Sequence, residues 1–540
     1  MIISTTQLKY TYTFSKIIIL VSFCGIFLSS SAQTPNVLLI IADDLGTDAL
    51  KGYTTQSLLP TTPTIDSLRA IGVTFSSAWS SPVCTPTRAS IMSGKHGSKT
   101  GVFKAPGNLD TSHISILKVL KEETNDTYAK AVIGKWHISN PSNPLHPTEH
   151  GADYYMGLLG AFPEDYSAWS KTENGITTTD STYITSTLTD RAITWTSQQT
   201  KPWLLWLAHA APHSPFHEPP SHMYTIPNPT TNTRKFLAMI ESVDFEINRL
   251  LSSMTTAERD NTLIIFIGDN GTPGNVLRDY PSGHGKSTVY EGGIRVPFIV
   301  AGAGVTRKGE RESAMVNVAD IYATILEMTG SDLDGGLNNS LSFKHLLTGT
   351  SEQANRDYNY AEIKEGNKLI WAIRNHQYKL ITLSTGEQEF YDLLTDSFEY
   401  NPIDLNNLTS EQTAIKADLQ EEAATRQTDW SCRDHIKNGD EAGIDCGGSS
   451  CTPCIMGIDN STLQELHIYP NPSTGNITLS LENGQIQEVK IFNTIGELVY
   501  TQDKISSNRL TLNLNPMKSN LYHIEIQTNI GKLVKRLIKI

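Results

Sequence analysis

The stretch with the strongest consequences for folding is residues 36–44, Asn-Val-Leu-Leu-Ile-Ile-Ala-Asp-Asp. An unbroken apolar run of this length is typical of a central parallel strand that is buried on both faces of its sheet. Helices then cover both faces, which predicts an α/β domain. Ligands of such sheets bind at the carboxyl ends of the strands, which is where Asp43 and Asp44 stand.

The same pattern recurs at residues 261–271, Asn-Thr-Leu-Ile-Ile-Phe-Ile-Gly-Asp-Asn-Gly. Again an apolar strand is followed by oxygen donors, here Asp269 and Asn270. Adjacent carboxylates repel each other unless a cation lies between them. Because the donors at the two strand ends are hard oxygen atoms, with no Cys or His among them, they favour Ca²⁺ or Mg²⁺ over zinc.

Residues 80–101 place a cysteine, a proline and an arginine in the spacing Cys84-x-Pro86-x-Arg88. Pro86 suits the first turn of a helix, and Gly94 can end that helix. Cys84 then lies at the helix N-terminus, where free N–H groups point at it, and Arg88 follows one turn later on the same side. This arrangement suits a tetrahedral oxyanion, whereas an isolated cysteine would more simply be a buried structural thiol.

The spacing differs from the Cys-x5-Arg loop of phosphatases, and it resembles the signature of the formylglycine-dependent sulfatases, C/S-x-P-x-R followed by A-S-x-x-[ST]-G. Ala89, Ser90, Ser93 and Gly94 match the second part. The resemblance implies that a maturation enzyme oxidises Cys84 to formylglycine (3-oxoalanine), whose hydrate is the nucleophile. It also implies an alkaline-phosphatase-like mixed sheet with helices on both faces.

The two strand-end motifs resemble the sulfatase metal motifs D-D-x-G and G-D-N-G, with Gly46 and Gly268 in place. The resemblance implies one Ca²⁺ ion in the site. The residues that it implies as metal neighbours are Asp43, Asp44, Cys84, Asp269 and Asn270.

A third apolar segment, residues 129–137, reads Ala-Lys-Ala-Val-Ile-Gly-Lys-Trp-His. As a strand it would direct Lys135 and His137 to the same side, because side chains alternate along a strand. The segment resembles the G-K-W-H motif of the sulfatases. Residues 282–297 resemble a further family motif, which implies that Lys286 contacts sulfate, while His284 is a weaker candidate for contact with substrate.

Three histidines follow an apolar strand expected at residues 203–207. His209, His213 and His217 are spaced as on one face of a helix, but four prolines between residues 212 and 220 exclude that helix, and with it a two-histidine zinc site. The sequence Ala-Pro-His-Ser-Pro resembles the family motif A-P-H-x-P, which singles out His213. The other two histidines are expected to be pocket or structural residues.

The resemblance also implies roles for the site residues in the hydrolysis of a sulfate ester. Arg88, Lys135, Lys286 and Ca²⁺ would offset the charge of the sulfate ester in the transition state. His213 is expected to protonate the leaving alcohol and His137 to take a proton from the hydrate, with the reverse assignment left open.

The N-terminus is expected to be a signal peptide over residues 1–32, with a mature start at Gln33. Lys9 and Lys16 precede an apolar run at residues 17–28, and small residues follow. The run is too short for a membrane anchor. A lipoprotein site at Cys24 is disfavoured by the bulky residue before it.

Further along, we expect a catalytic domain over residues 33–350 and a smaller antiparallel α+β subdomain over 351–427. The helical pattern at 320–326 and the alternating pattern at 369–394, typical of an antiparallel hairpin, both resemble sulfatase segments. A linker over 428–460 carries the cysteines Cys432, Cys446, Cys451 and Cys454. In an exported protein they favour two disulfides, with zinc as the alternative.

Residues 461–540 are expected to be a separate all-β domain. Its Ile-Tyr-Pro-Asn-Pro motif and basic end resemble the C-terminal sorting domain of type IX secretion, and a carbohydrate-binding β-sandwich is the alternative. The resemblance implies the type IX machinery as a partner and a secreted or cell-surface protein.

The net charge of the 540-residue chain is −13, which disfavours nucleic acid as a partner and requires a local basic pocket for any polyanionic substrate. We therefore expect an exported sulfatase, a sulfuric ester hydrolase, acting on sulfated algal polysaccharides such as ulvan or on their oligosaccharides. The alternatives are a phosphonate or phosphodiester hydrolase of the same superfamily and an inactive sulfoglycan-binding protein.

Overall fold

The computed structural model describes residues 34–331, 339–349, 355–427 and, between 466 and 539, all except 470, 472, 482–483, 494–496, 519 and 530. The chain divides into two compact units, Met1–Trp430 and Ser431–Ile540, and each is described by itself. The expected signal peptide and the four linker cysteines, Cys432, Cys446, Cys451 and Cys454, lie outside the described residues.

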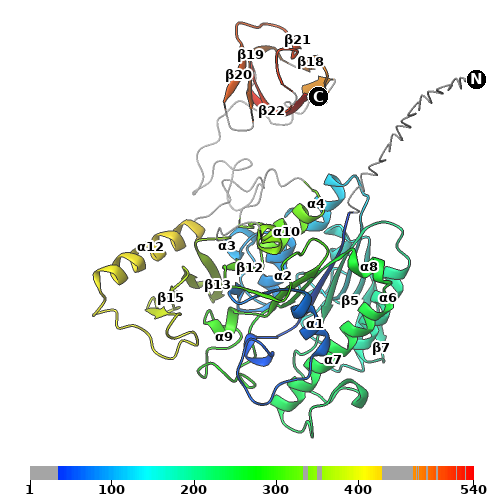
Figure 1. The fold of residues 1–540 in the computed structure, drawn as a ribbon, viewed down its shortest axis with the longest axis vertical. Coiled ribbons are helices and arrows are strands. Elements are labelled where there is room, and N and C mark those ends of the chain that lie inside the picture. Colours follow the sequence, from blue (N-terminus) through cyan, green and yellow to red (C-terminus); the bar gives the residue numbers. More distant parts are fainter. Residues whose placement is uncertain are drawn as a thin grey trace, which may run out of the picture. The chain divides into compact units, whose positions relative to one another are not determined.

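A ten-stranded mixed sheet forms the centre of the first unit (Figure 1). From edge to edge its strands are β11 (Glu310–Glu312), β2 (Gly72–Phe75), β10 (Phe298–Gly302), β9 (Thr262–Gly268), β1 (Asn36–Ala42), β8 (Trp203–His209), β4 (Ala129–Lys135), β5 (Tyr154–Leu158), β6 (Trp169–Glu173) and β7 (Ile176–Asp180). The middle strands β9, β1, β8, β4 and β5 are parallel. Strands β10 and β6 pair antiparallel with the parallel block on either side.

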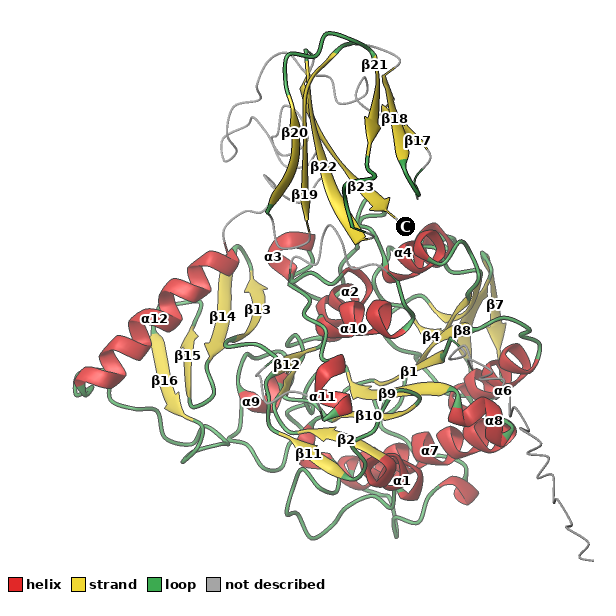
Figure 2. Cartoon of the chain, turned by 45° about the horizontal axis from the view of Figure 1, so that its top comes forward, coloured by secondary structure: helices red, strands yellow, loops and turns green. Residues whose placement is uncertain are grey.

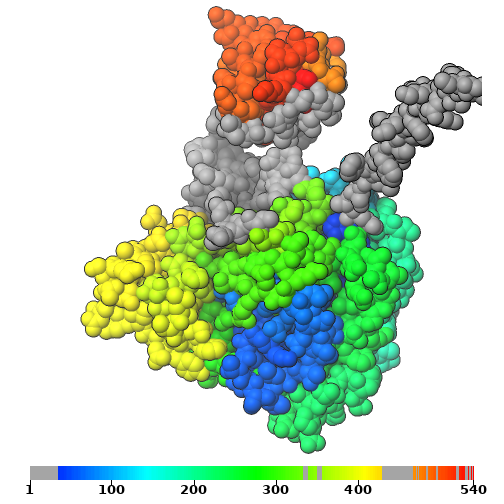
Figure 3. Space-filling view, viewed as in Figure 1, coloured from blue at the N-terminus to red at the C-terminus, as the bar shows by residue number. Residues whose placement is uncertain are grey.

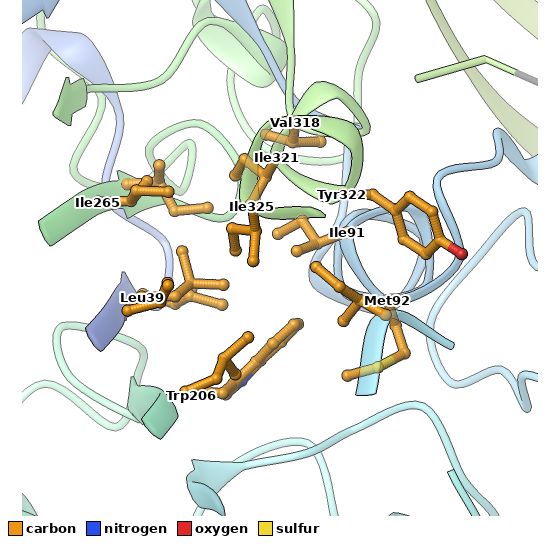
Figure 4. Close-up of a cluster of buried hydrophobic side chains, with 14 of the residues drawn as sticks. Leu39, Ile91, Met92, Trp206, Ile265, Val318, Ile321, Tyr322 and Ile325 are labelled. Carbon is orange, nitrogen blue, oxygen red and sulfur yellow. The ribbon is translucent and has the colours of Figure 1, made fainter. Parts of the chain in front are cut away.

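Strand β1 is buried over its whole length because its side chains enter two different cores. Leu39 packs with α2 (Cys84–Ser93), α4 (Ile116–Glu123) and α10 (Asp320–Met328) on one face, and Figure 4 shows it facing Ile325. Leu38 packs on the other face with α1 (Pro63–Ile71), α6 (Ile184–Ser197) and α7 (Asn232–Ser253). The continuous apolar run therefore reflects helices on both faces, as expected for the α/β fold class.

A smaller antiparallel sheet completes the first unit and forms the lobe drawn in yellow in Figure 3. It contains β13 (Asn359–Glu365), β14 (Lys368–Arg374), β15 (Tyr378–Thr382) and β16 (Gln388–Asp392), with α12 (Ser410–Gln427) packed on it through Leu419 and Ala423. The alternating segment predicted as a hairpin is thus three strands of a four-stranded sheet.

Short elements connect these layers. They are η1 (Thr47–Ala49), β3 (Ala78–Trp79), α3 (Gly97–Thr100), α5 (His146–Glu149), η2 (Ser221–Met223), α8 (Thr256–Asp260), α9 (Glu291–Ile294), β12 (Val316–Asn317) and α11 (Lys344–Thr348).

The described residues of the second unit form β structure (Figure 2). One antiparallel sheet holds β17 (Leu466–Tyr469), β18 (Asn476–Leu481) and β21 (Arg509–Asn513), and the other holds β20 (Leu498–Gln502), β19 (Ile486–Asn493), β22 (Asn520–Thr528) and β23 (Gly531–Lys539). Side chains from both sheets, among them Ile477 and Ile524, share one core. Across the described ranges, no helix combines the length and apolar character that a membrane crossing requires.

Candidate active site

The candidate residues meet at one edge of the large sheet. Since β1 is parallel to β9 and β8, and β8 is parallel to β4, the carboxyl ends of these strands lie side by side. Asp43 and Asp44 follow β1, Asp269 and Asn270 follow β9, and Lys135 is the last residue of β4. This is the edge at which open α/β sheets bind their ligands.

Cys84 is the first residue of α2, as expected, and Gly94 ends that helix with a left-handed φ of 69°. Every residue of α2 is buried, and Cys84 retains 3% exposure. Its Sγ lies 3.2 Å from Nδ1 of His137. Burial raises the pKa of the Cys84 thiol, and although Lys135 opposes that rise, the carboxylates of Asp43 and Asp269 add to it.

Three buried carboxylates in the site each lie against one cationic side chain. The pairs are Asp269 Oδ2 with Arg88 Nη2 at 2.7 Å, Asp43 Oδ2 with Lys135 Nζ at 2.5 Å, and Asp44 Oδ1 with Lys286 Nζ at 2.5 Å. In formal charge the three pairs balance. The structure thus brings together, within one cluster, all three cationic residues that the sequence singled out.

Crowding of the carboxylates shows in their pKa values. Burial and then the neighbouring charge of Asp43 raise the pKa of Asp269 to about 6, even though Arg88 opposes the shift. Burial also disfavours ionisation of Asp43, but Lys135 and the other cationic neighbours hold its pKa below the usual range. A bound cation relieves this kind of repulsion between buried carboxylates.

The donor atoms fit a hard divalent cation. Oδ1 of Asp43 and Oδ1 of Asn270 are buried and have no hydrogen-bond partner within the described part of the chain. Buried polar atoms normally have a partner, so these two oxygens have free acceptor capacity. Ligand atoms of Asp43, Cys84 and Asp269 lie within 4.8 Å of one another. Carboxylate and amide oxygens converging in this way suit Ca²⁺ or Mg²⁺.

His137 reaches the site differently from the prediction. Strand β4 ends at Lys135, and His137 has a φ of 54°, so the expectation that one strand carries both side chains is wrong for His137. The turn after the strand, in which the His137 N–H donates to the carbonyl of Leu159 at 3.2 Å, directs its ring to Cys84 instead. Burial, followed by the charges of Lys135 and Arg88, lowers the pKa of His137 to about 2. The ring is therefore neutral at pH 7.

His213 contacts a different residue of the cluster from His137. Its Nε2 is 3.6 Å from Oδ2 of Asp44, and its Nδ1 is 2.6 Å from the carbonyl oxygen of Ser214. Because a carbonyl only accepts, Nδ1 carries a proton, and Nε2 faces the site.

The remaining histidines of the motifs lie outside this cluster of contacts. His209 is fully buried at the end of β8, and His217 packs on Tyr166 with ring centroids 4.2 Å apart. His284 stacks on Tyr290, with ring centroids 3.6 Å apart and the ring planes nearly parallel.

A cavity of about 940 Å³ lies away from the strand ends, between α1 and α7. Its buried carboxylates accept hydrogen bonds from backbone N–H groups. Asp244 accepts from Thr64 and Ile65, and Glu241 accepts from Thr61. These carboxylates therefore hold loops in place, and the strand-end cluster is the better candidate for chemistry.

The family of this chain follows from its similarity to known proteins. The profile described as Sulfatase matches residues 35–331, more than half of the chain. This chain belongs to the sulfatase family. Within the sulfatase, residues 283–429 match the profile described as N-sulphoglucosamine sulphohydrolase, C-terminal, and residues 467–540 match the secretion system C-terminal sorting domain.

Relatives of this sulfatase include enzymes named for sulfated glycans. It is 26% identical over 435 residues to an ulvan-active sulfatase of Formosa agariphila, covering 74% of this chain and 83% of that one. It is 29% identical over 339 residues to mouse arylsulfatase J, covering 57% of this chain but only 54% of the relative. The solved structure of Ps i-CgsB with k-i-k-neocarrahexaose shares 26% identity at a TM-score of 0.65, over 74% of this chain and 93% of that one.

Sequence reasoning missed two aromatic residues that hold the sulfatase's His213. Tyr166 Oη lies within hydrogen-bonding distance of the carbonyls of Ala210 and His213, at 2.8 and 2.7 Å. Phe162 stacks on the His213 ring, with centroids 5.2 Å apart and planes 15° apart. Both residues come from the segment between β5 and β6, where no local pattern marks them.

Proposed function

We propose that this chain is an exported sulfatase that hydrolyses sulfate monoesters on sulfated polysaccharides, such as ulvan, or on their oligosaccharides. The observation that carries the proposal is the position of Cys84, at the N-terminus of α2 and 3.2 Å from His137, beside a buried cluster of three carboxylates and three cations. Family membership and the names of the relatives support it.

The proposal includes formylglycine at residue 84 and one Ca²⁺ ion held by Asp43, Asp44, Asp269 and Asn270. Hydrated formylglycine supplies a nucleophilic hydroxyl, and Ca²⁺ supplies positive charge for the sulfate oxygens. Because the side chains balance in formal charge, a divalent cation makes the site net positive, which offsets the overall negative charge of the protein near an anionic ester.

The cationic side chains would then change partners. Lys135 and Lys286 each have a carboxylate within 2.5 Å. When those carboxylates face a metal ion, the two ammonium groups become available to hold the sulfate oxygens. Arg88 makes a two-atom contact with Asp269, through Nε and Nη2, and so would fix that carboxylate.

The two histidines would handle protons on opposite sides of the sulfate. His137 is neutral and adjacent to residue 84, so it can accept a proton from the nucleophile. His213 has Nε2 near Asp44 in the site, and in its imidazolium form, with a proton on each ring nitrogen, it can give the Nε2 proton to the leaving alcohol, which a sugar oxygen requires.

Export is part of the same proposal. The sorting domain supports secretion or attachment at the cell surface. We assign residues 1–32 to a signal peptide, 33–350 and 351–427 to the two sulfatase parts, 428–460 to a linker, and 461–540 to the sorting domain.

The test is sulfate release by the purified chain, produced together with a formylglycine-generating enzyme. We expect release from p-nitrophenyl sulfate and from ulvan or carrageenan oligosaccharides, with far slower turnover of aryl phosphonates and phosphodiesters. Peptide mass analysis should show loss of the thiol sulfur at residue 84, and metal analysis should show one Ca²⁺. Cys84→Ala should abolish turnover.

Three results would contradict parts of this proposal. Faster turnover of phosphodiesters would favour the other hydrolase class. An alkylatable Cys84 in fully active protein would exclude the modification. Stoichiometric zinc, or full activity after exhaustive chelation, would exclude the Ca²⁺ site.

A further inference from the structure

A cavity of about 430 Å³ is lined by residues that contact the candidate active site, among them Phe162 and Leu159. It lies between the segment after β5, from Leu158 to Glu164, and the hairpin of β6 and β7, where Ser170, Thr172 and Thr177 line it. Its volume is within the range of sites that bind small molecules.

The wall of this cavity is tied directly to the catalytic residues. The carbonyls of Leu158 and Leu159 accept hydrogen bonds from the backbone N–H groups of Trp136 and His137, at 2.9 and 3.2 Å. His137 in turn contacts Cys84. A molecule in the cavity therefore lies next to the turn that positions the proposed base.

Phe162 links the cavity to the other histidine. Its ring lines the cavity, stacks on His213 and yet remains 48% exposed. A large aromatic ring that is half exposed and stacks on a candidate catalytic histidine offers its other, apolar face to a ligand. The electron-rich face of such a ring attracts the C–H groups of a sugar.

The polar groups of the cavity indicate what kind of sugar fits. The hydroxyl groups of Ser170 and Thr177 can exchange hydrogen bonds with sugar hydroxyls, and the buried hydroxyl of Thr172 lies 2.8 Å from that of Thr177 and fixes its position. Among the described residues that line it, Glu164 is charged, and none is a lysine, arginine or histidine. A second sulfate in this cavity would therefore meet negative charge without a cationic partner.

We propose that this cavity is a substrate subsite for an unsulfated sugar ring, covalently linked to the sulfated ring, and that Phe162 is the platform on which the unsulfated ring stacks. This inference rests on the proposed function, because it places the sulfated ring at Cys84. It assigns Phe162 to substrate recognition in addition to its contact with His213.

The test compares substrates with and without neighbouring rings. We would measure hydrolysis of ulvan- and carrageenan-derived hexasaccharides and of p-nitrophenyl sulfate by the parental chain, Phe162→Ala and Phe162→Trp. We expect Phe162→Ala to raise KM for the hexasaccharide by about tenfold, with a clearly smaller change for p-nitrophenyl sulfate, and Phe162→Trp to restore the hexasaccharide KM. A fall in kcat for the hexasaccharide with its KM unchanged would overturn the platform and leave Phe162 as a support for His213.

A binding measurement separates this proposal from the proposed function. Calorimetric titration with the desulfated hexasaccharide requires no turnover, and we expect Phe162→Ala to bind it about tenfold more weakly than the parental chain. Ile176→Ala is the matched control, since Ile176 is 70% exposed on β7 beside the cavity but does not line it. Absence of binding by the parental chain would overturn the subsite, whereas absence of any sulfate release would overturn the proposed function.

Discussion

His137 holds a backbone conformation, φ 54°, that side-chain-bearing residues rarely adopt, and this places its ring against Cys84. The strand before it and the hydrogen bond to Leu159 fix the turn, so the ring is already in position. His213 is held by the Tyr166 hydroxyl, which donates to its backbone carbonyl, and by the Phe162 ring, which stacks on its side chain. Two rings fixed against different residues of the cluster, Cys84 and Asp44, suit two separate proton transfers.

Substitution of the two histidines should separate these transfers. General acid catalysis is typically worth about 10²–10⁴-fold, and a sugar alkoxide depends on it far more than an aryl oxide does. His213→Ala should therefore lose about that factor on carbohydrate sulfates and much less on p-nitrophenyl sulfate, while His137→Ala should slow both substrates. Steady-state kinetics on the two esters is the measurement, with the exposed His222→Ala as the control. Equal losses for His213→Ala on both esters would remove its role as the acid.

At the level of residues, the sequence predicted which side chains lie close together, but not the backbone conformation that places each of them. The carboxylates and Cys84 could be predicted because each sits at the end of a strand or helix whose local pattern is strong. The conformation of His137 could not, since it depends on a hydrogen bond to Leu159, a residue far along the chain. Phe162 was also missed, because its link to the site is a contact with His213, which is distant in sequence.

At the scale of elements, the contact between β4 and β8 depends on one glycine. Gly134, next to Lys135, has a φ of 113°, and a Cβ there would lie 1.9 Å from the carbonyl oxygen of Ala208 on β8. The pairing of these strands carries Lys135 to the site. The G-K motif is therefore explained by close approach of two strands, in addition to chemistry.

Gly134→Ala should destabilise the first unit by about 2–5 kcal/mol, because it combines a strained φ with a clash against backbone. Chemical denaturation followed by tryptophan fluorescence would measure this. Gly101→Ala is the control, since Gly101 also has a positive φ, 72°, but open space around the added Cβ. It should cost only about 1–2 kcal/mol, and a similar loss in both variants would refute the clash.

Helix α7 carries a carboxylate whose burial makes stability depend on pH. Burial raises the pKa of Asp244 to about 6, although backbone N–H groups of Thr64 and Ile65 oppose the rise. The folded state thus binds the proton more tightly than the unfolded state, where the pKa is about 4. This group's stabilising contribution is complete below about pH 4 and is lost as the pH rises through 6.

Asp244→Asn should remove that dependence while keeping an acceptor oxygen for one of the two N–H groups, which bond to different carboxylate oxygens. The free energy of unfolding of the parental chain minus that of the variant should fall by up to about 2–3 kcal/mol between pH 4 and pH 7. Denaturation curves at four or five pH values would show it. A difference that stays constant or increases with pH would contradict the raised pKa.

At the scale of the molecule, the chain consists of two units with separate cores, and all the residues of the candidate site belong to the first. The α/β class and the all-β C-terminal unit were predictable, because a run buried on both faces and strict alternation are unambiguous patterns. The short strands β2 and β11 at one edge of the large sheet were not, because strands of three or four residues have little periodicity of their own.

A chain that ends after Gln427 should therefore keep its turnover of p-nitrophenyl sulfate within about twofold, a change too small to indicate a lost catalytic contact. In cells with type IX secretion it should fail to reach the surface or the medium. Activity assays and cell fractionation are the measurements. A large fall in activity toward this small ester would show that the second unit contributes to catalysis.

The burial of Cys84 also determines whether its modification can come before or after folding. The residue is 3% exposed at the start of a helix that is buried throughout, so no second enzyme can surround it once the domain has formed. If residue 84 is oxidised as proposed, the oxidising enzyme must meet this stretch as an open chain, during synthesis or before folding. Maturation and folding then compete for the same segment, and each molecule that folds first remains a thiol for the rest of its lifetime.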